Sequence, residues 1–439
     1  MPLLNQHIKQ GYNITDFAVF NSDGTKNTSL GPLLAKLQYT ESITENHIKL
    51  SVQLTDTGLS VKDGSNTVGV LDGLKLNGTE YAQLKIEDGL GNSLNFSSAD
   101  GTQLRVSGIR EKIEDNLSSV FVLDLVSAEC FENEQVRVDG DFDGKASKTV
   151  EKILKDYLKT PKDLHIEESL NEVPCTGNVT EDTPFSLCTS LGPRSIPTTP
   201  GANENSAGFF FFETYDGYNF KSIESLLDKN RSYKKYMYNN YTDCPPKYDG
   251  KILEYIPKTD INLLQKMKAG TYGAKVYTTN FFDNAYKESV KSANEEKLNL
   301  LGTELPQFSN DFSTVDGNFR PTKVFAKVES FGSTKNISAE KSKEKDFDDD
   351  KTLAQSKMRY NQLFTVKATI TIAGDLSHRA GDLIYCDFQR VTSSKTEQIS
   401  LRNSGLYTIA DLSHFISARD GIYTKMNLVR DSFGRQPFK

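Results

Sequence analysis

The chain has 439 residues, of which 36% are hydrophobic and 25% are charged, and its formal net charge is −7. This length is too great for one hydrophobic core and predicts roughly two to four globular domains. The acidic balance argues against high-affinity DNA binding, which depends on Lys and Arg neutralising phosphates. No stretch approaches the roughly 20 apolar residues of a membrane helix, and the N-terminus lacks the apolar segment of a secretory signal, so we expect no membrane span.

The first part of the chain, residues 1–130, predicts an all-β domain. Residues 47–56 and 81–88 alternate apolar and polar side chains, which is typical of half-buried antiparallel strands. Residues 104–129 read as two strands joined by a charged turn, with the second strand at 120–126. Asp-Gly and Asn-Gly turns punctuate these runs and favour a sandwich or a barrel.

The next part, residues 131–355, predicts a mixed α+β region. Apolar residues recur at helical spacing in 144–160, and 183–193 predicts a short helix that stops at Gly192-Pro193. A further helix over 261–270 ends at the C-cap Gly270, and a strand follows it. The charge run at 339–351 is interpreted as a solvated loop.

Four consecutive phenylalanines, Phe209–Phe212, interrupt this mixed region. A strand of this composition is apolar on both faces, so both faces must be covered. One cover is a domain core, and the other is a neighbouring domain or a neighbouring subunit. In residues 218–223 the side chains then alternate, as in a strand with one solvent-exposed face.

The last section returns to β-structure. Residues 366–372 and 381–390 alternate, and 405–434 contains two strands around the turn at Asp420-Gly421. Two segments of the chain show a weak internal similarity, here called the echo. They are "VFVLDLVSAE" near the end of the first β-region and "YTKMNLVRDS" near the end of the last one. The echo suggests a duplicated β-domain, although hairpins of any origin look alike.

One stretch resembles a metal loop. Asp139, Asp141, Asp143 and Gly144 match the start of a D-x-D-x-D-G calcium loop, but the twelfth position is Val150 where a bidentate Glu is needed. A strand-like segment precedes it where a helix is required. We interpret the loop as a turn that leads into a helix, with calcium binding as the alternative.

No catalytic constellation is recognisable. The histidines are far apart in sequence, and His414, between Ser413 and Phe415 in a predicted strand, is interpreted as structural. The scattered cysteines form no C-x-x-C pair and no disulfide or zinc pattern, so free thiols in a reducing compartment are expected. We assign no catalytic, cofactor-binding or metal residue and expect no enzyme. The cysteines are Cys130, Cys175, Cys188, Cys244 and Cys386; the other histidines are His7, His47, His165 and His378.

Residues 205–227, "NSAGFFFFETYDGYNFKSIESLL", closely resemble a segment of the baseplate hub proteins of contractile-tailed bacteriophages. Those proteins carry a similar Gly-aromatic-aromatic-Phe-Glu-Thr hairpin followed by Asp-Gly-aromatic and Phe-(basic)-Ser-Ile. The segments at 132–158, 186–197, 262–283 and 404–435 resemble the family in the same order. The resemblance spans about residue 30 to the C-terminus.

The resemblance implies a mainly β fold with α+β insertions: two tail-tube-like antiparallel β-barrels plus a mixed connecting domain. It also implies a homotrimer, whose six barrels form a pseudo-sixfold ring. The expected domains are barrel one at 1–130, the connecting domain at 131–205 and 246–355, barrel two at 206–245 and 356–432, and a tail at 433–439.

The function implied is a structural one in the virion, assembled in the host cytoplasm. The ring joins the sixfold tail tube to the threefold central spike, and genome and tape-measure protein pass through its channel. The expected partners are the tail-tube protein or a tube-initiator ring, the central spike protein, the tape-measure protein, baseplate wedge proteins and unspecifically contacted phage DNA. The short basic–aromatic C-terminus is expected either to dock on a partner or to fray.

Two alternatives remain open. The hub of a bacterial contractile injection system of the type VI kind shares this architecture. A calcium-dependent β-rich binding protein would instead need exposed aromatics and a working site at Asp139–Asp143.

Overall fold

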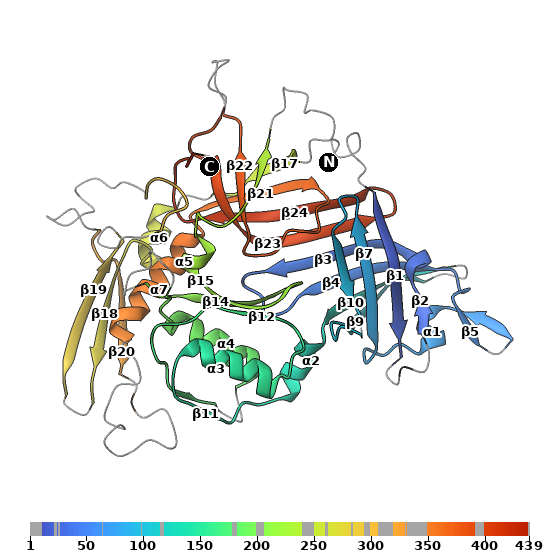
Figure 1. Ribbon diagram of the computed structural model, residues 1–439, viewed down its shortest axis with the longest axis horizontal. Coiled ribbons are helices and arrows are strands. Elements are labelled where there is room, and N and C mark those ends of the chain that lie inside the picture. The colour runs from blue at the N-terminus through green and yellow to red at the C-terminus, as the bar shows by residue number, and fades with distance from the viewer. Residues whose placement is uncertain are drawn as a thin grey trace.

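The computed structural model has one large, mostly antiparallel sheet with helices and smaller sheets beside it (Figure 1). This confirms the expected mainly β fold with α+β insertions. The structure describes residues 11–437 except 22–23, 25–26, 64, 98, 115–117, 178–181, 199–205, 239–249, 260–261, 282–283, 294–298, 306–318, 330, 332–348 and 391–398.

The large sheet takes strands from both ends of the chain. These strands are β1 (Tyr12–Phe20), β2 (Asn27–Ser29), β3 (Leu34–Ser42), β4 (Lys49–Asp56), β7 (Tyr81–Asp88), β8 (Ser93–Phe96), β9 (Leu104–Glu114), β10 (Ser119–Ser127), β16 (Lys234–Met237), β17 (Ile252–Pro257), β21 (Val366–Ala373), β22 (Leu383–Asp387), β23 (Gly405–Ser417) and β24 (Gly421–Arg430). The order is β17-β21-β24-β23-β3-β4-β10-β9-β7-β1-β2, with β8, β16 and β22 attached beside this path. The strands expected from alternation around 47–56, 81–88, 104–129 and 405–434 are confirmed.

The N-terminal and C-terminal β-regions meet where β3 pairs with β23. The pairing is antiparallel and runs from Ser42 opposite Asp411 to Lys36 opposite Ser417. In Figure 1 the blue and red strands therefore lie side by side in one sheet. Each region keeps its own apolar cluster. Val52, Leu84 and Leu123 lie in the N-terminal one, whereas Ile370, Ile409 and Met426 lie in the C-terminal one.

Between the two β-regions the chain forms a smaller mixed unit. Its elements are α2 (Ala128–Gln135), β11 (Asp141–Phe142), α3 (Ala146–Lys152), a π-helical turn (Ile153–Tyr157), β12 (Leu164–Ile166), β13 (Cys175–Thr176), α4 (Pro184–Leu191), β14 (Phe209–Thr214) and β15 (Gly217–Ser222). The helices expected in 144–160 and 183–193 are present. Thr183 starts α4 because its side chain accepts a hydrogen bond from the Ser186 N–H.

The phenylalanine strand β14 lies in this mixed unit and not in the sheet of the second β-region, where we expected residues 206–245. It pairs with β15, and β15 pairs in parallel with β12; of the described strands in 206–245, only β16 joins the large sheet. The expected burial of both faces is confirmed. Phe209 and Phe211 pack in the cluster with α3 and α4, whereas Phe212 packs in another cluster with Ile223 and Leu363. Both covers come from the same chain, because α5 (Ile223–Leu226), α7 (Asp349–Leu363) and strands β22, β23 and β24 supply the second one.

A separate three-stranded sheet lies at the left of Figure 1. It contains β18 (Gly273–Thr279) between β19 (Tyr286–Ser292) and β20 (Lys323–Val328), and α6 (Leu263–Ala269) precedes it. As expected, α6 ends at Gly270, which has a left-handed φ of 75°. The helix α7 was not expected, and it starts inside the charge run; residues 339–348 of that run lie outside the described residues.

The remaining short elements lie in the N-terminal half and beside α4. They are the 3-10 turns Gly31–Leu33 and Gly192–Arg194, the hairpin β5 (Val61–Asp63) and β6 (Asn66–Val68), and α1 (Val70–Leu74). Among the described helices, none combines the length and the hydropathy needed to cross a lipid bilayer.

The C-terminal segment docks on its own chain. Phe433 and Glu304 exchange backbone hydrogen bonds, and the Arg435 guanidinium lies 3.0 Å from the Asp387 carboxylate. The Gln436 side-chain amide donates to the Gly302 carbonyl oxygen over 2.6 Å. These contacts hold residues 433–436 against β22 and the segment at 302–304.

Candidate functional site

The large sheet has one apolar face, and its other face is polar except where Leu383, Tyr385, Leu406 and Val429 pack under α5 and α7. Its apolar face carries the two core clusters, because alternate side chains of each strand point to the same side. On the opposite face a row of polar side chains crosses six strands in register. From β17 to β4 this row contains Glu254, Thr371, Lys425, Ser413, Thr40 and Lys49.

Hydrogen bonds between polar side chains of this face cross the contact between the two β-regions. The hydroxyl oxygens of Thr40 and Ser413 are 3.3 Å apart, and Ser42 donates to the Asp411 carboxylate over 2.6 Å. Asp411 also accepts from the Asn427 side-chain amide over 3.0 Å. Asn427 in turn accepts from the Thr369 hydroxyl over 2.7 Å. The polar face is therefore a continuous, ordered surface.

The polar face carries charges of both signs. Lys36, Lys49 and Lys425 share it with Glu254 and Asp411, and uncharged polar residues occupy most of the positions between them. A surface of this composition lacks the dense cationic groups that hold phosphates by counterion release.

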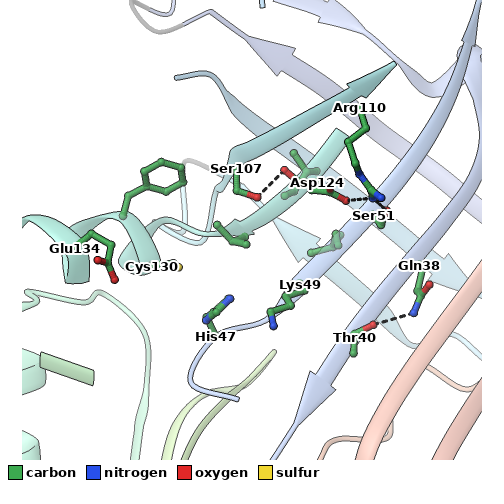
Figure 2. A pocket seen from close by; sticks show the side chains of 14 residues that line it. Gln38, Thr40, His47, Lys49, Ser51, Ser107, Arg110, Asp124, Cys130 and Glu134 are labelled. Atoms are coloured by element: carbon green, nitrogen blue, oxygen red, sulfur yellow. Dashed lines mark hydrogen bonds and ion pairs between the residues drawn. The ribbon is translucent and has the colours of Figure 1, made fainter. Parts of the chain in front are cut away.

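A groove of about 680 Å³ opens at one end of this face, between the sheet and α2 (Figure 2). At the rim of the groove, Arg110 of β9 lies 2.7 Å from the Asp124 carboxylate of β10. His47 and Lys49 border the groove on the other side. Burial, with a smaller effect of Lys49, lowers the pKa of His47. Cys130 of α2 lies at its apolar floor. The groove contains no paired base and nucleophile.

A buried ionic cluster fastens the N-terminal β-region to the mixed unit. The Lys162 ammonium lies 2.5 Å from the Glu213 carboxylate and 2.7 Å from that of Glu129. Glu213 also accepts hydrogen bonds from the Ser127 hydroxyl and the Ile48 backbone N–H. Burial raises the pKa of Glu213, and Lys162 opposes that rise. The cluster has two carboxylates and one cation. It is a junction because Glu129 lies in α2, Glu213 lies in β14 and Lys162 lies just before β12.

Glu41 makes a similar junction on the apolar side of β3, on the same face as Tyr39. Its carboxylate accepts from the Tyr39 hydroxyl over 2.6 Å and from the backbone N–H groups of Tyr215 and Ala380, each over 2.8 Å. One side chain thereby links β3, the β14–β15 turn and the loop after β21. Burial raises the pKa of Glu41 to about 7, against the opposing effect of Arg379.

A third cluster anchors α7. The buried Arg359 guanidinium lies 2.9 Å from the Glu224 carboxylate of α5 and 3.2 Å from that of Asp431, just after β24. It joins the second β-region to the helices that cover β14. The sequence analysis missed all three clusters, because their members lie up to 339 residues apart. The only local signal is a charged residue inside an otherwise apolar strand, as at Glu213.

The acidic loop at 139–143 has its own partners within the chain. The Thr176 hydroxyl donates to the Asp141 carboxylate over 2.7 Å, and the Tyr157 hydroxyl donates to that of Asp139 over 3.3 Å. Asp143 is exposed. Across the described ranges, no three His, Cys, Asp or Glu side chains form a group that could hold a metal ion. The loop leads into α3, as the turn interpretation expects.

Several of the histidines and cysteines considered as bases or nucleophiles are buried in cores. Burial lowers the pKa of His414 to about 3, and its Nδ1 lies 2.8 Å from the Thr424 hydroxyl. Burial raises the pKa of Cys175 to about 11 and raises those of Cys188 and Cys386 further. Thiols with raised pKa values are poor nucleophiles at neutral pH. Cys244 lies outside the described residues.

Comparison with known proteins supports the fold of the chain alone. No family model matches the sequence, and no curated protein matches it either. A tail protein from Neisseria meningitidis MC58 aligns with a TM-score of 0.51 at 11% sequence identity, over 96% of this chain and 97% of its own. The 43 kDa tail protein of prophage MuSo2 from Shewanella oneidensis aligns with a TM-score of 0.50 at 9% identity, over 95% of this chain and 99% of its own. The chain therefore has the fold of these two tail proteins, which confirms the tail-protein fold that the resemblance predicted.

Proposed function

We propose that the chain is a non-enzymatic structural hub of a phage tail baseplate and works as a homotrimer. The observation that carries the proposal is the joint between β3 and β23. It puts two β-regions of one chain side by side in one sheet with one polar face. Three such chains supply six β-regions, which match a sixfold tube on one side and a threefold spike on the other.

Two strand edges of the large sheet are suited to close such a ring. In the described part of the chain, β17 pairs along one side only, and β9 beyond Arg105 pairs with β10 but with no strand on its other side. Unpaired strand edges are templates for pairing with another chain. We propose that β9 of one copy pairs with β17 of the next, so that the polar face continues around the ring.

In this arrangement the polar face lines the channel. Its mixed charges and hydroxyl groups interact weakly with phosphates, so DNA and the tape-measure protein pass without being held. The tail-tube protein or a tube-initiator ring and the central spike bind the two ends of the ring, and wedge proteins bind its outside. The place of action is the virion, after assembly in the host cytoplasm.

Native mass in solution, followed by an image of the assembled particle, tests the proposal. We expect a species of three chains and a ring about one tail tube wide with an open centre. A strictly monomeric chain that is also absent from the ring in particle images contradicts the proposal.

A further inference from the structure

The cluster of Lys162, Glu129 and Glu213 holds an amine and two carboxyl groups in a place from which water is excluded. The exposed fractions of these three side chains are 6%, 4% and 0%, in that order. The Lys162 nitrogen also lies over the ring of the buried Tyr218, 5.7 Å from its centroid. Amide formation needs a nucleophilic amine, an acyl group and a carrier of protons, and this cluster contains a candidate for each.

The contacts of Glu213 give its two carboxyl oxygens different surroundings. Its Oε1 lies 2.5 Å from the Lys162 Nζ. Its Oε2 accepts hydrogen bonds from the Ser127 hydroxyl over 2.6 Å and from the Ile48 backbone N–H over 3.0 Å. Two fixed donors stabilise negative charge on the oxygen that they contact, as in an oxyanion hole. The amine therefore lies against a carboxyl group whose other oxygen is prepared to take up charge.

Glu129 is placed to move a proton. Its Oε2 lies 2.7 Å from the Lys162 Nζ, and its Oε1 accepts from the Thr160 hydroxyl over 2.6 Å. Glu129 and the Oε1 of Glu213 thus contact the same nitrogen. A proton that Glu129 takes from this nitrogen can be passed to that oxygen.

We propose that Lys162 and Glu213 condense to an isopeptide bond, with Glu129 as the catalytic residue. The ammonium first gives a proton to the Glu213 Oε1, which leaves a neutral amine and a carboxylic acid. The nitrogen lone pair then attacks Cδ, so the C–N bond forms and Oε2 takes the negative charge. Glu129 accepts a second proton from the nitrogen and gives it to the Oε1 hydroxyl group, whose C–O bond breaks. One water molecule leaves, the amide carbonyl forms and the Glu129 carboxylate is restored.

The buried site favours this reaction although the ion pair is its resting state. Burial lowers the pKa of Lys162, but the two carboxylates outweigh burial and raise it, and burial raises the pKa of Glu213. Proton transfer within the pair removes two charges from a place of low dielectric constant, which offsets part of its cost. The fixed contact replaces an encounter between free groups, and the exclusion of water protects the product from hydrolysis.

The bond joins β14 to the segment before β12, between residues 51 apart in the chain. A covalent link of this kind restricts the unfolded chain, as a disulfide does. The cluster is a junction in either state, as an ion pair or as an amide. The inference goes beyond the proposed function and does not depend on how many chains form a ring.

The mass of the intact, denatured chain tests the proposal. The full chain is purified in its folded state, kept at neutral pH, denatured and weighed by mass spectrometry. We expect a mass below that of the amino-acid sequence by one water molecule, and a protease digest with a branched peptide that joins Lys162 to Glu213. A chain of full mass, or a lost water that maps to other residues, overturns the proposal.

A matched pair of lysine variants gives a second readout. Lys162→Arg keeps a cation but replaces the amine with a guanidinium that stays protonated. Lys148→Arg makes the same change at the exposed pair with Glu151. We expect Lys148→Arg to lack one water molecule, as the parent does, and Lys162→Arg to have its full mass and to migrate differently on a denaturing gel. Loss of water from Lys162→Arg overturns the proposal.

Glu129→Gln tests the catalytic residue. The amide cannot take a proton from the nitrogen, so the bond should form about a hundredfold more slowly after synthesis, a size typical of losing one acid–base group. A time course of the intact mass measures this rate, for chains whose circular dichroism matches that of the parent. A rate equal to that of the parent overturns the role given to Glu129.

Discussion

Thr40 of β3 and Ser413 of β23 lie opposite each other, with their hydroxyl oxygens 3.3 Å apart, although 373 residues separate them in the chain. Their strands make the two β-regions a single sheet. The contact is therefore both the joint of the fold and the centre of the polar face.

The first prediction concerns this joint. Ser413→Pro removes a backbone donor and imposes a φ that disturbs the ladder with β3 and β24, so it should lower the free energy of unfolding by about 3 kcal/mol or more. Ser413→Ala is the control, and we expect it to cost about 1 kcal/mol or less because only a partly exposed hydroxyl is lost. Urea titration followed by circular dichroism measures both. Equal stability of the two variants contradicts the role given to the joint.

The second prediction concerns the cluster of Lys162, Glu129 and Glu213. Lys162→Met leaves two buried carboxylates without their cation, so it should destabilise the chain by about 3–5 kcal/mol. Lys148→Met, which removes an exposed pair with Glu151, should cost about 1 kcal/mol or less. Thermal unfolding of both variants measures the difference. A Lys162→Met loss as small as that of the control means that this cluster is not a structural junction.

The third prediction is a pH dependence from Glu41. Its pKa is raised from 4.5 to about 7 in the folded chain, so the folded state binds more protons than the unfolded state between these values. Its contribution is fully present below pH 4.5 and is lost as pH rises to 7, a change of about 3 kcal/mol. His378 and His414 act in the opposite direction, because burial lowers their pKa values to about 4 and about 3.

Comparison with Glu41→Gln separates these contributions. The variant lacks the titrating carboxylate but keeps both histidines, so the difference in unfolding free energy between parent and variant should change with pH from 5 to 7.5. The parent should lose its advantage as the pH rises. Parallel pH profiles for the two proteins would show that Glu41 does not titrate in this range.

The fourth prediction tests ring closure through the strand edges. Ile113 of β9 and Ile256 of β17 are 61% and 38% exposed, and each lies on one of the two proposed edges. A chain with both Ile113→Cys and Ile256→Cys should form covalent dimers and trimers under mild oxidation, seen on non-reducing gels. The single variants should not form trimers, since each offers only half of the link. If cysteines at positions 110 and 254, which lie on the same face as 113 and 256, also give no link, the β9–β17 pairing is wrong.

The sequence predicted the elements whose signals are local. The hairpin of β23 and β24 followed from alternation around the Asp420-Gly421 turn, and α6 followed from helical spacing and its Gly270 cap. The helix α7 was missed because several residues on its buried side are polar, so its hydrophobic period is weak. These residues are Thr352, Gln355, Ser356, Arg359 and Gln362.

Relationships between distant segments could not be predicted in the same way. The burial of both faces of Phe209–Phe212 followed from composition, but what covers them depends on tertiary packing. Part of the polar face comes from the alternation in 47–56 and 405–434, which the sequence analysis used only to predict strands. Its continuity across the sheet depends on the pairing of β3 with β23, for which no local pattern exists. Apart from residues 206–222, which lie in the mixed unit, the division into domains stays a prediction.

The joint between β3 and β23 also affects how a ring assembles. Because both strands belong to one polypeptide, half of the seams in a ring of three chains form when each chain folds, at an effective concentration that dilution does not change. In the proposed ring only three seams between molecules remain, all of one kind, where six separate subunits would need six.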